Sequence, residues 1–321
     1  MKAGRSRKWS ASLLPGVAAM GLAFSMIACG SSSKPVVTET AAPSGFASAA
    51  EAGQALQSAA KSNDQSAMSR AMGAKSMALL KTGDASADKA AMDSFAAKFE
   101  EMNRWVPMTN GSQILYIGAD NYPFPIPLAK DSSGKWQFDP VAGREEITAR
   151  DIGRNELLAI DAVQAIADAE EAYFQKAHDG NPAHVYTQII VSDPGKQDGL
   201  YWDASATQEA NPLGKLSDFA PSPLSPLGPG EPQVLDGYSL RILGAQGDKA
   251  KGGAKSYMAN GKMTGGYAVI ASPLTYKKTG IKTFIVSKDG VIYEQDLGEK
   301  TTDLAAAIEG FNPTDAWTAT E

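Results

Sequence analysis

The sequence predicts an α+β fold in two domains, each built from helices followed by an antiparallel sheet. Twice along the chain, apolar residues at helical spacing give way to short alternating segments, which is the order expected when helices pack on a hairpin-rich sheet. Gly, Asn and Asp turns separate the alternating segments, as in antiparallel hairpins. About 275 residues follow the N-terminal region, and this length exceeds one typical domain.

Residues 1–28 have the composition of a signal peptide. Four Lys and Arg residues precede position 10, and no acidic residue occurs before Glu39. The apolar run over 11–28 is broken by Pro and Gly and is shorter than the ~20 residues that a membrane-spanning helix needs. We therefore expect this segment to direct export and to be removed.

Met26-Ile27-Ala28-Cys29-Gly30 resembles a lipobox, the motif in which a cysteine is acylated before cleavage. Cys29 is the only cysteine of the chain, so it can form no intramolecular disulfide. We predict that Cys29 carries the lipid and anchors the protein to the membrane of the cell envelope. A secretory signal with an ordinary buried cysteine is the alternative. Because Gly30 and not Asp follows, we expect the outer membrane, facing the periplasm, if the bacterium has two membranes.

Residues 29–45 are rich in Ser, Thr, Ala and Pro and predict a flexible tether. The whole chain has 30 basic and 36 acidic residues, and loss of the four signal-peptide cations leaves 26 against 36, a net charge of −10. This balance argues against nucleic acid as a partner and against docking on anionic lipid.

The first domain is predicted over residues 46–140. A capping box at Ser48-Ala49-Ala50-Glu51 begins a helix, and a short helix follows around 66–72. The clearest helix covers 87–106, where apolar residues recur every three or four positions at Met92, Phe95, Phe99, Met102 and Val106. Three strands are then expected at Gln113–Ile117, Tyr122–Ala129 and Lys135–Phe138.

This order resembles the cone-shaped nuclear-transport-factor-2-like fold, which is common in small ligand-binding domains. In such a cone a ligand cavity would be lined by Met92, Phe95, Phe99 and Trp136. Plain core packing is the favoured interpretation of the same stripe.

Pro123, Pro125 and Pro127 alternate with apolar residues in the second of these strands. Prolines in this register remove the N–H donors from one edge, so we predict an edge strand that resists further pairing. A proline-rich docking ligand is the alternative.

The second domain is predicted over residues 143–317. A helix over 144–149 is interrupted at Gly153, and the longest helix runs over 155–177 before a Gly and Pro stop signal. An ordered loop over the core is expected next. Four strands and a short helix over 303–309 follow, the last two strands joined by a tight primed turn at Asp289-Gly290; the strands are Tyr238–Leu243, Gly266–Ser272, Lys282–Ser287 and Val291–Gln295.

Blocks such as NYPFPIPL, KWQFD, AGREEI and FNPTDAW resemble a bacterial family of exported proteins, the domain of unknown function 2950. The likeness covers residues 46–317 in order. It implies no activity, because the family has none established.

A fainter resemblance links NELLAIDAVQAIADAEEAY to type IV pilin-like subunits, in which such a helix packs on an antiparallel sheet. The matching positions are Asn155, Glu156, Ala169, Glu170 and Tyr173. Charged residues, and no apolar helix, precede Asn155. The chain is therefore not expected to enter a pilus core, although it would present a pilin-like surface to a partner.

The sequence contains no motif for catalysis. His178 and His184 are the only histidines and are expected to be exposed in a polar loop. The acidic turn over 193–199 lacks the ligand pattern of a calcium loop, and no nucleophile elbow or phosphate-binding loop occurs. We expect no catalytic residue, metal or cofactor.

Two functions are consistent with these observations. The favoured one is a non-enzymatic envelope lipoprotein that binds a protein partner in an assembly or accessory role. The alternative is a small-molecule-binding protein or hydrolase that uses a cavity in the first domain.

Overall fold

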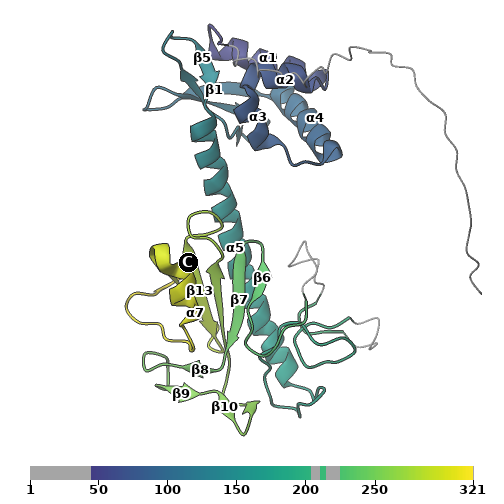
Figure 1. The fold of residues 1–321 in the computed structure, drawn as a ribbon, viewed down its shortest axis with the longest axis vertical. Coiled ribbons are helices and arrows are strands. Elements are labelled where there is room, and N and C mark those ends of the chain that lie inside the picture. The colour runs from purple at the N-terminus through teal and green to yellow at the C-terminus, as the bar shows by residue number, and fades with distance from the viewer. Residues whose placement is uncertain (1–44, 204–209, 215–224, 321) are drawn as a thin grey trace, which may run out of the picture. The chain divides into compact units, whose positions relative to one another are not determined.

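The computed structural model describes residues 45–203, 210–214 and 225–320. Cys29, the predicted signal peptide and the predicted tether up to residue 44 lie outside the described residues. The chain is an α+β protein in two parts (Figure 1). Each part has a hydrophobic core of its own. The N-terminal part contains α1 (Ala49–Lys61), α2 (Gln65–Met72), α3 (Ala74–Leu80), α4 (Ala85–Glu101), β1 (Asn103–Pro107), β2 (Gln113–Ile117), β3 (Tyr122–Pro123), β4 (Leu128–Lys130) and β5 (Trp136–Phe138).

Polar side chains begin three of the first four helices. Ser48 Oγ accepts a hydrogen bond from the Glu51 backbone nitrogen at 3.1 Å, which confirms the predicted cap of α1. Asp64 and Asp84 cap α2 and α4 in the same way. Helix α3 was not predicted; it begins after Gly73, whose φ of 82° turns the chain sharply between α2 and α3.

The predicted helix over 87–106 is too long at its C-terminal end. Helix α4 ends at Glu101, and Val106 lies on strand β1, where it is paired with Ile114 of β2. The Gly118 backbone nitrogen lies 3.0 Å from the carbonyl oxygens of both Lys98 and Met102. Since the last carbonyls of a helix need donors from elsewhere, this contact ends α4.

The first sheet has the order β1-β2-β4-β5, with β3 also paired to β2. The predicted edge strand over 122–129 is therefore wrong: it is two short strands, and β4 lies between β2 and β5. Pro125 and Pro127 cannot donate to a ladder, so the chain leaves the sheet between β3 and β4. Phe124 and Ile126 in this interval are buried in the core.

Helix α5 (Pro140–Phe174) is one continuous helix of 35 residues. The prediction of two helices interrupted at Gly153 is wrong, and so is the expected end at 177. Asp139 caps the start, because its Oδ1 accepts from the backbone nitrogens of Val141 and Ala142 at 2.8 and 3.2 Å. A glycine costs only ~1 kcal/mol inside a helix, and α5 continues through Gly153. The helix also crosses the boundary predicted between residues 140 and 143.

The second part contains a six-stranded antiparallel sheet of order β15-β14-β13-β12-β7-β6. The four central strands are those predicted, with small shifts at their ends. Two edge strands, β6 and β15, were missed because each is only two or three residues long. The strands are β6 (Gln233–Leu235), β7 (Tyr238–Leu243), β12 (Ala268–Pro273), β13 (Lys282–Ser287), β14 (Ile292–Asp296) and β15 (Thr318–Ala319).

Shorter elements complete the second part. Only Gly290 has a positive φ, at 77°, in the turn between β13 and β14, so this turn is not of the predicted primed type. The remaining elements are β8 (Ala245–Gln246), β9 (Lys255–Ser256), β10 (Met258–Ala259), β11 (Lys262–Met263), a 3₁₀ turn η2 (Gly298–Lys300) and α7 (Thr301–Ala306).

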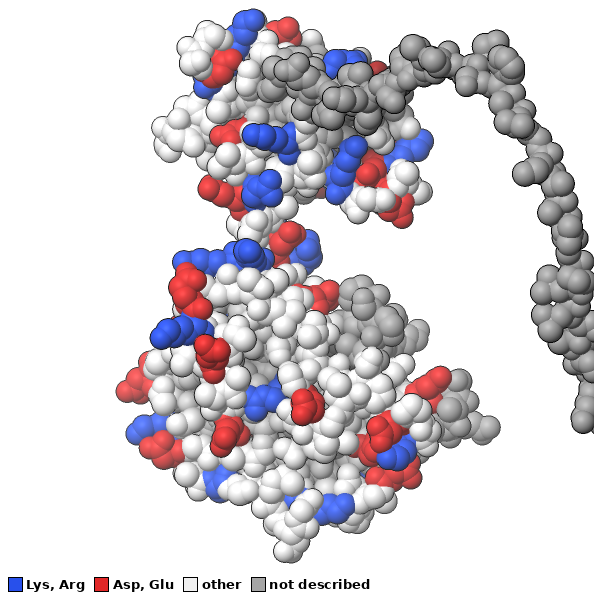
Figure 2. Space-filling model, viewed as in Figure 1, with Lys and Arg blue, Asp and Glu red and all other residues white. Residues whose placement is uncertain are grey.

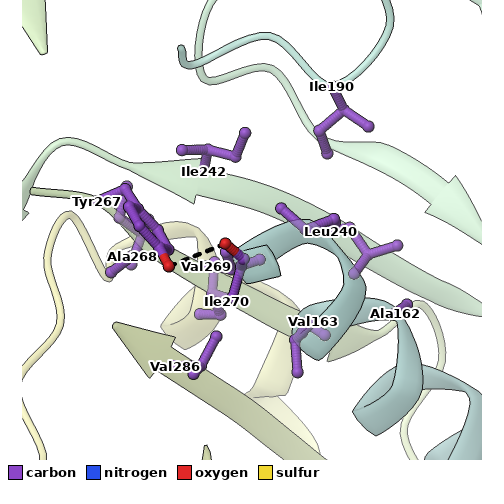
Figure 3. Close-up of a cluster of buried hydrophobic side chains, with 14 of the residues drawn as sticks. Ala162, Val163, Ile190, Leu240, Ile242, Tyr267, Ala268, Val269, Ile270 and Val286 are labelled. Carbon is purple, nitrogen blue, oxygen red and sulfur yellow. Dashed lines mark hydrogen bonds between the residues drawn. The ribbon is translucent and has the colours of Figure 1, made fainter. Parts of the chain in front are cut away.

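The core of the second part forms where α5 packs on the middle of the sheet (Figure 3). Val163 of α5 belongs to this core with Val269 of β12 and Val286 of β13, which are paired across the two strands, and all three are fully buried. Tyr267 donates from its hydroxyl to the Ala167 carbonyl oxygen of α5 at 3.0 Å, so this buried hydroxyl has a hydrogen-bond partner. The described parts of the loop after α5 add buried residues such as Leu200 and Trp202 to this core.

Among the residues that the structure describes, no helix has both the length and the apolar character needed to cross a bilayer.

Candidate functional site: a methionine-lined cavity

A cavity of about 340 Å³ lies within the N-terminal part, between the helices and the sheet. Its inner wall is apolar, with Leu56 of α1, Ile117 of β2 and Phe124 among the buried residues that line it. Four methionines supply much of the remaining wall: Met68, Met72, Met77 and Met92.

The local fold brings these methionines together. Met68 and Met72 are one turn apart on α2 and so share a face of that helix. The turn at Gly73 separates α2 from α3, and Met77 of α3 lines the same cavity. Met92 and Phe95, three residues apart on α4, line it from the other side.

The charged side chains of the cavity lining lie on its solvent-facing side. Lys81, just after α3, is exposed, and Lys98 on α4 is about one third exposed. Asp88 Oδ1 accepts from the backbone nitrogen and from the hydroxyl of Thr82, both at 2.8 Å, and these bonds lower the pKa of Asp88. The cavity is thus apolar inside and polar at its rim.

Tyr122 lies at the rim between two cations. The Lys98 Nζ lies 5.5 Å from the centre of its ring, and the Arg150 guanidinium lies 5.4 Å from it. Arg150 also donates to the Tyr122 hydroxyl at 3.1 Å. Lys98 in turn contacts Asp120 at 2.6 Å, and this hydrogen bond lowers the pKa of Asp120.

Of the four residues for which a cavity role was considered, Met92 and Phe95 line the cavity. Phe99 and Trp136 do not. Phe99 packs beneath Gly53 of α1, where an added Cβ would lie 3.1 Å from its ring. Trp136 exchanges two backbone hydrogen bonds of 2.9 Å with Phe46 and lies under the Lys130 side chain.

The family model "Protein of unknown function (DUF2950)" matches residues 44–320. The chain belongs to this family. No curated protein and no solved structure matches it. The match covers both described parts of the chain. The residues of the cavity and of the six-stranded sheet therefore both lie within the DUF2950 match.

The lining of the DUF2950 cavity holds three charged side chains, Lys81, Asp88 and Lys98, and no histidine or cysteine. Nor do the described residues contain a group of three His, Cys, Asp or Glu side chains that could hold a metal ion.

A second, polar hollow of about 240 Å³ lies in the C-terminal part of this DUF2950 member, with Asp179, Asn181 and Lys262 in its lining. His178, expected to be exposed, is instead partly buried and stacked on Tyr173 at 4.0 Å. Sequence reasoning missed this because the aromatic partner lies five residues back, at the end of α5. His184 is exposed, as expected.

Glu170 is fully buried beneath this region. Its Oε2 accepts from the Thr187 backbone nitrogen at 3.1 Å, and its Oε1 has no hydrogen-bond partner among the described residues. Burial raises the pKa of Glu170 well above its ordinary value, and the neighbouring Glu171 raises it further. Glu170 thus belongs to the core, in surroundings that favour its neutral form.

The residues of the pilin-like resemblance have internal roles in this structure. Asn155 and Glu156 hydrogen-bond the turn that precedes β13. Ala169, Glu170 and Tyr173 are buried against the sheet or the following loop. Packing of a long helix on an antiparallel sheet accounts for all five positions.

On the face shown in Figure 2, acidic and basic side chains are interspersed over both parts, and neither sign gathers into a continuous patch.

Proposed function

We propose that this DUF2950 member is a non-enzymatic, lipid-anchored binding protein of the cell envelope. Its binding site is the methionine-lined cavity, which takes up the apolar part of a small molecule. The cavity itself is the observation that supports this proposal. It favours a small-molecule ligand over the protein partner that the sequence alone favoured.

The size and lining of the cavity support a ligand site. Its volume of about 340 Å³ lies at the lower end of the ~300–1,000 Å³ typical of small-molecule sites. Methionine side chains are flexible and polarizable, so they adapt to ligands of different shape. Helices that close over an antiparallel sheet around a cavity are also what a nuclear-transport-factor-2-like cone would provide, and we include that fold in the proposal.

The hydrolase alternative has less support. Asp88 already accepts two hydrogen bonds from Thr82, and no histidine lies near Ser94 in the lining to activate its hydroxyl.

A neutral apolar fluorophore such as N-phenyl-1-naphthylamine tests the cavity. The protein is the mature chain with Cys29→Ser, so that no attached acyl chain competes for the site. Ala91 is exposed and lines the cavity, so Ala91→Phe should block it with little effect on folding. Ala90 is exposed on the same helix but does not line the cavity, so Ala90→Phe is the matched control.

We expect saturable binding to the parent chain and to Ala90→Phe, and at least tenfold weaker binding to Ala91→Phe. Equal binding to all three proteins, or none to any, would show that the cavity is not a ligand site.

The lipid anchor needs its own test. Cys29→Ser in the full precursor should move the protein from the membrane fraction to the soluble fraction of the envelope. Retention of the variant in the membrane would contradict the anchor and leave the cavity proposal intact.

A further inference from the structure

We propose that the ligand is a single-chain anionic amphiphile, with its acyl chain among the methionines and its acidic head group at Lys81 and Lys98. This inference rests on the proposed function and adds the chemical class of the ligand.

The distribution of polarity in the cavity matches such a molecule. The deep wall is made of buried apolar side chains such as Leu56, Met72 and Ile117, each 2% exposed or less. The charged lining residues are Lys81, Asp88 and Lys98, and the first and last of these are solvent-accessible. A ligand that fills the site therefore needs an apolar body and one polar end.

The volume suits one chain. A methylene group takes about the same space as the ~30 Å³ share of a water molecule in the liquid. A cavity of about 340 Å³ therefore accommodates a chain of roughly ten carbons. Burial of each further methylene should raise the affinity about fourfold until the cavity is full. Two acyl chains of a membrane phospholipid would exceed this space.

The rim favours a negative head group. Its lining contains two lysines and one carboxylate, and that carboxylate already accepts two hydrogen bonds from Thr82. Lys81 forms no ion pair or hydrogen bond with any residue that the structure describes, and its charge acts on the carboxylate of Asp88, whose pKa it helps to lower. Its ammonium group therefore keeps its donors for an anion. Lys98 pairs with Asp120, whose side chain is 58% exposed, and a bound head group would compete with this solvated partner.

Tyr122 adds a donor at the same place. Its hydroxyl oxygen accepts from Arg150, which leaves the hydroxyl hydrogen free to be donated to a carboxylate or phosphate oxygen. Arg150 itself is held by Glu146 at 2.8 Å on the preceding turn of α5, and so it positions Tyr122.

Displacement of the neutral fluorophore tests the head-group charge. Dodecanoate, dodecyl phosphate and dodecyltrimethylammonium are compared below their micelle concentrations, on the same Cys29→Ser mature chain. We expect both anions to displace the fluorophore at concentrations at least tenfold lower than the cation does. Across a series from hexanoate to hexadecanoate, affinity should rise up to ten or twelve carbons and then level off.

Three lysine variants locate the head group. Lys81→Gln and Lys98→Gln should each reduce the preference for anions by threefold or more, measured on each variant as the ratio of the displacing concentrations of cation and anion. Lys89→Gln is the matched control, because Lys89 lies on α4 outside the cavity and forms an exposed ion pair with Asp93 at 2.6 Å. Its preference should equal that of the parent chain.

The outcomes separate this inference from the proposed function. Equal displacement by anions and the cation, or preference for the cation, overturns the anionic ligand and leaves an apolar binding site. An anion preference that Lys89→Gln reduces as much as Lys81→Gln also overturns it, because the effect would then be one of net charge. If the fluorophore itself fails to bind, the proposed function falls and this inference falls with it.

Discussion

Glu156 Oε1 lies 2.8 Å from the backbone nitrogen of Ile281, which is 125 residues later in the sequence. The same oxygen accepts from the Lys282 nitrogen at 3.0 Å. Beside it, Asn155 donates from Nδ2 to the Thr279 carbonyl oxygen at 3.0 Å. Two adjacent side chains of α5 thus hold the turn that leads into β13, the strand that α5 covers.

Removal of the Glu156 carboxylate should destabilise the fold. Glu156→Ala leaves two half-buried N–H donors without an acceptor, and we expect the free energy of unfolding to fall by about 2 kcal/mol. Glu156→Gln keeps one carbonyl oxygen and should lose less. Glu145→Ala, on an exposed position of the same helix, should change the value by less than about 0.5 kcal/mol. Urea unfolding measures all three, and equal losses in the two alanine variants would contradict the role of Glu156.

The two glycines of α5 should respond to alanine in opposite ways. An added Cβ at Gly143 would lie 2.9 Å from Ile126 Cγ1, and Ile126 is fully buried, so Gly143→Ala should destabilise by about 1–3 kcal/mol. At Gly153 nothing lies within 4 Å of an added Cβ, so Gly153→Ala should stabilise by up to about 1 kcal/mol through helix propensity. Thermal unfolding of the two variants measures both signs. Stabilisation by both would mean that Gly143 has room for a side chain.

The sequence carries enough local information to locate most helices and the central strands. Ser48 and Glu51 mark the start of α1, and β7 and β13 have the predicted bounds. The ends of the helices and strands were harder to predict because they depend on contacts with residues distant in the sequence. Met102 and Val106 continue the apolar spacing of α4 beyond the end of that helix. In the structure the Gly118 backbone nitrogen contacts the last carbonyl oxygens of α4, and Val106 pairs with β2 as part of a strand. A pattern of neighbouring residues cannot predict contacts of this kind.

The cavity was only partly accessible to sequence reasoning. Met92 and Phe95 could be named because they lie on one strongly periodic helix. Met68, Met72 and Met77 lie on short helices whose packing depends on the turn at Gly73. A cluster of methionines over residues 68–77 was the available signal. Spacing alone could not say that these side chains face α4 across a cavity.

Buried Glu170 should make the stability of the protein depend on pH. Burial raises its pKa in the folded chain above the ordinary value of 4.5 that it regains on unfolding. Between these two values the unfolded chain binds fewer protons than the folded chain, so the free energy of unfolding falls as pH rises above about 4.5.

Glu170→Gln is nearly isosteric, keeps an acceptor for Thr187, and removes this ionisation. We expect the melting temperature of the variant to match that of the parent near pH 4 and to exceed it by a growing margin toward pH 7. Glu145→Gln changes the net charge equally on an exposed position and should show no such trend. A variant at Glu170 that is less stable than the parent at pH 7 would mean that the carboxyl is ionised and paired in the folded protein.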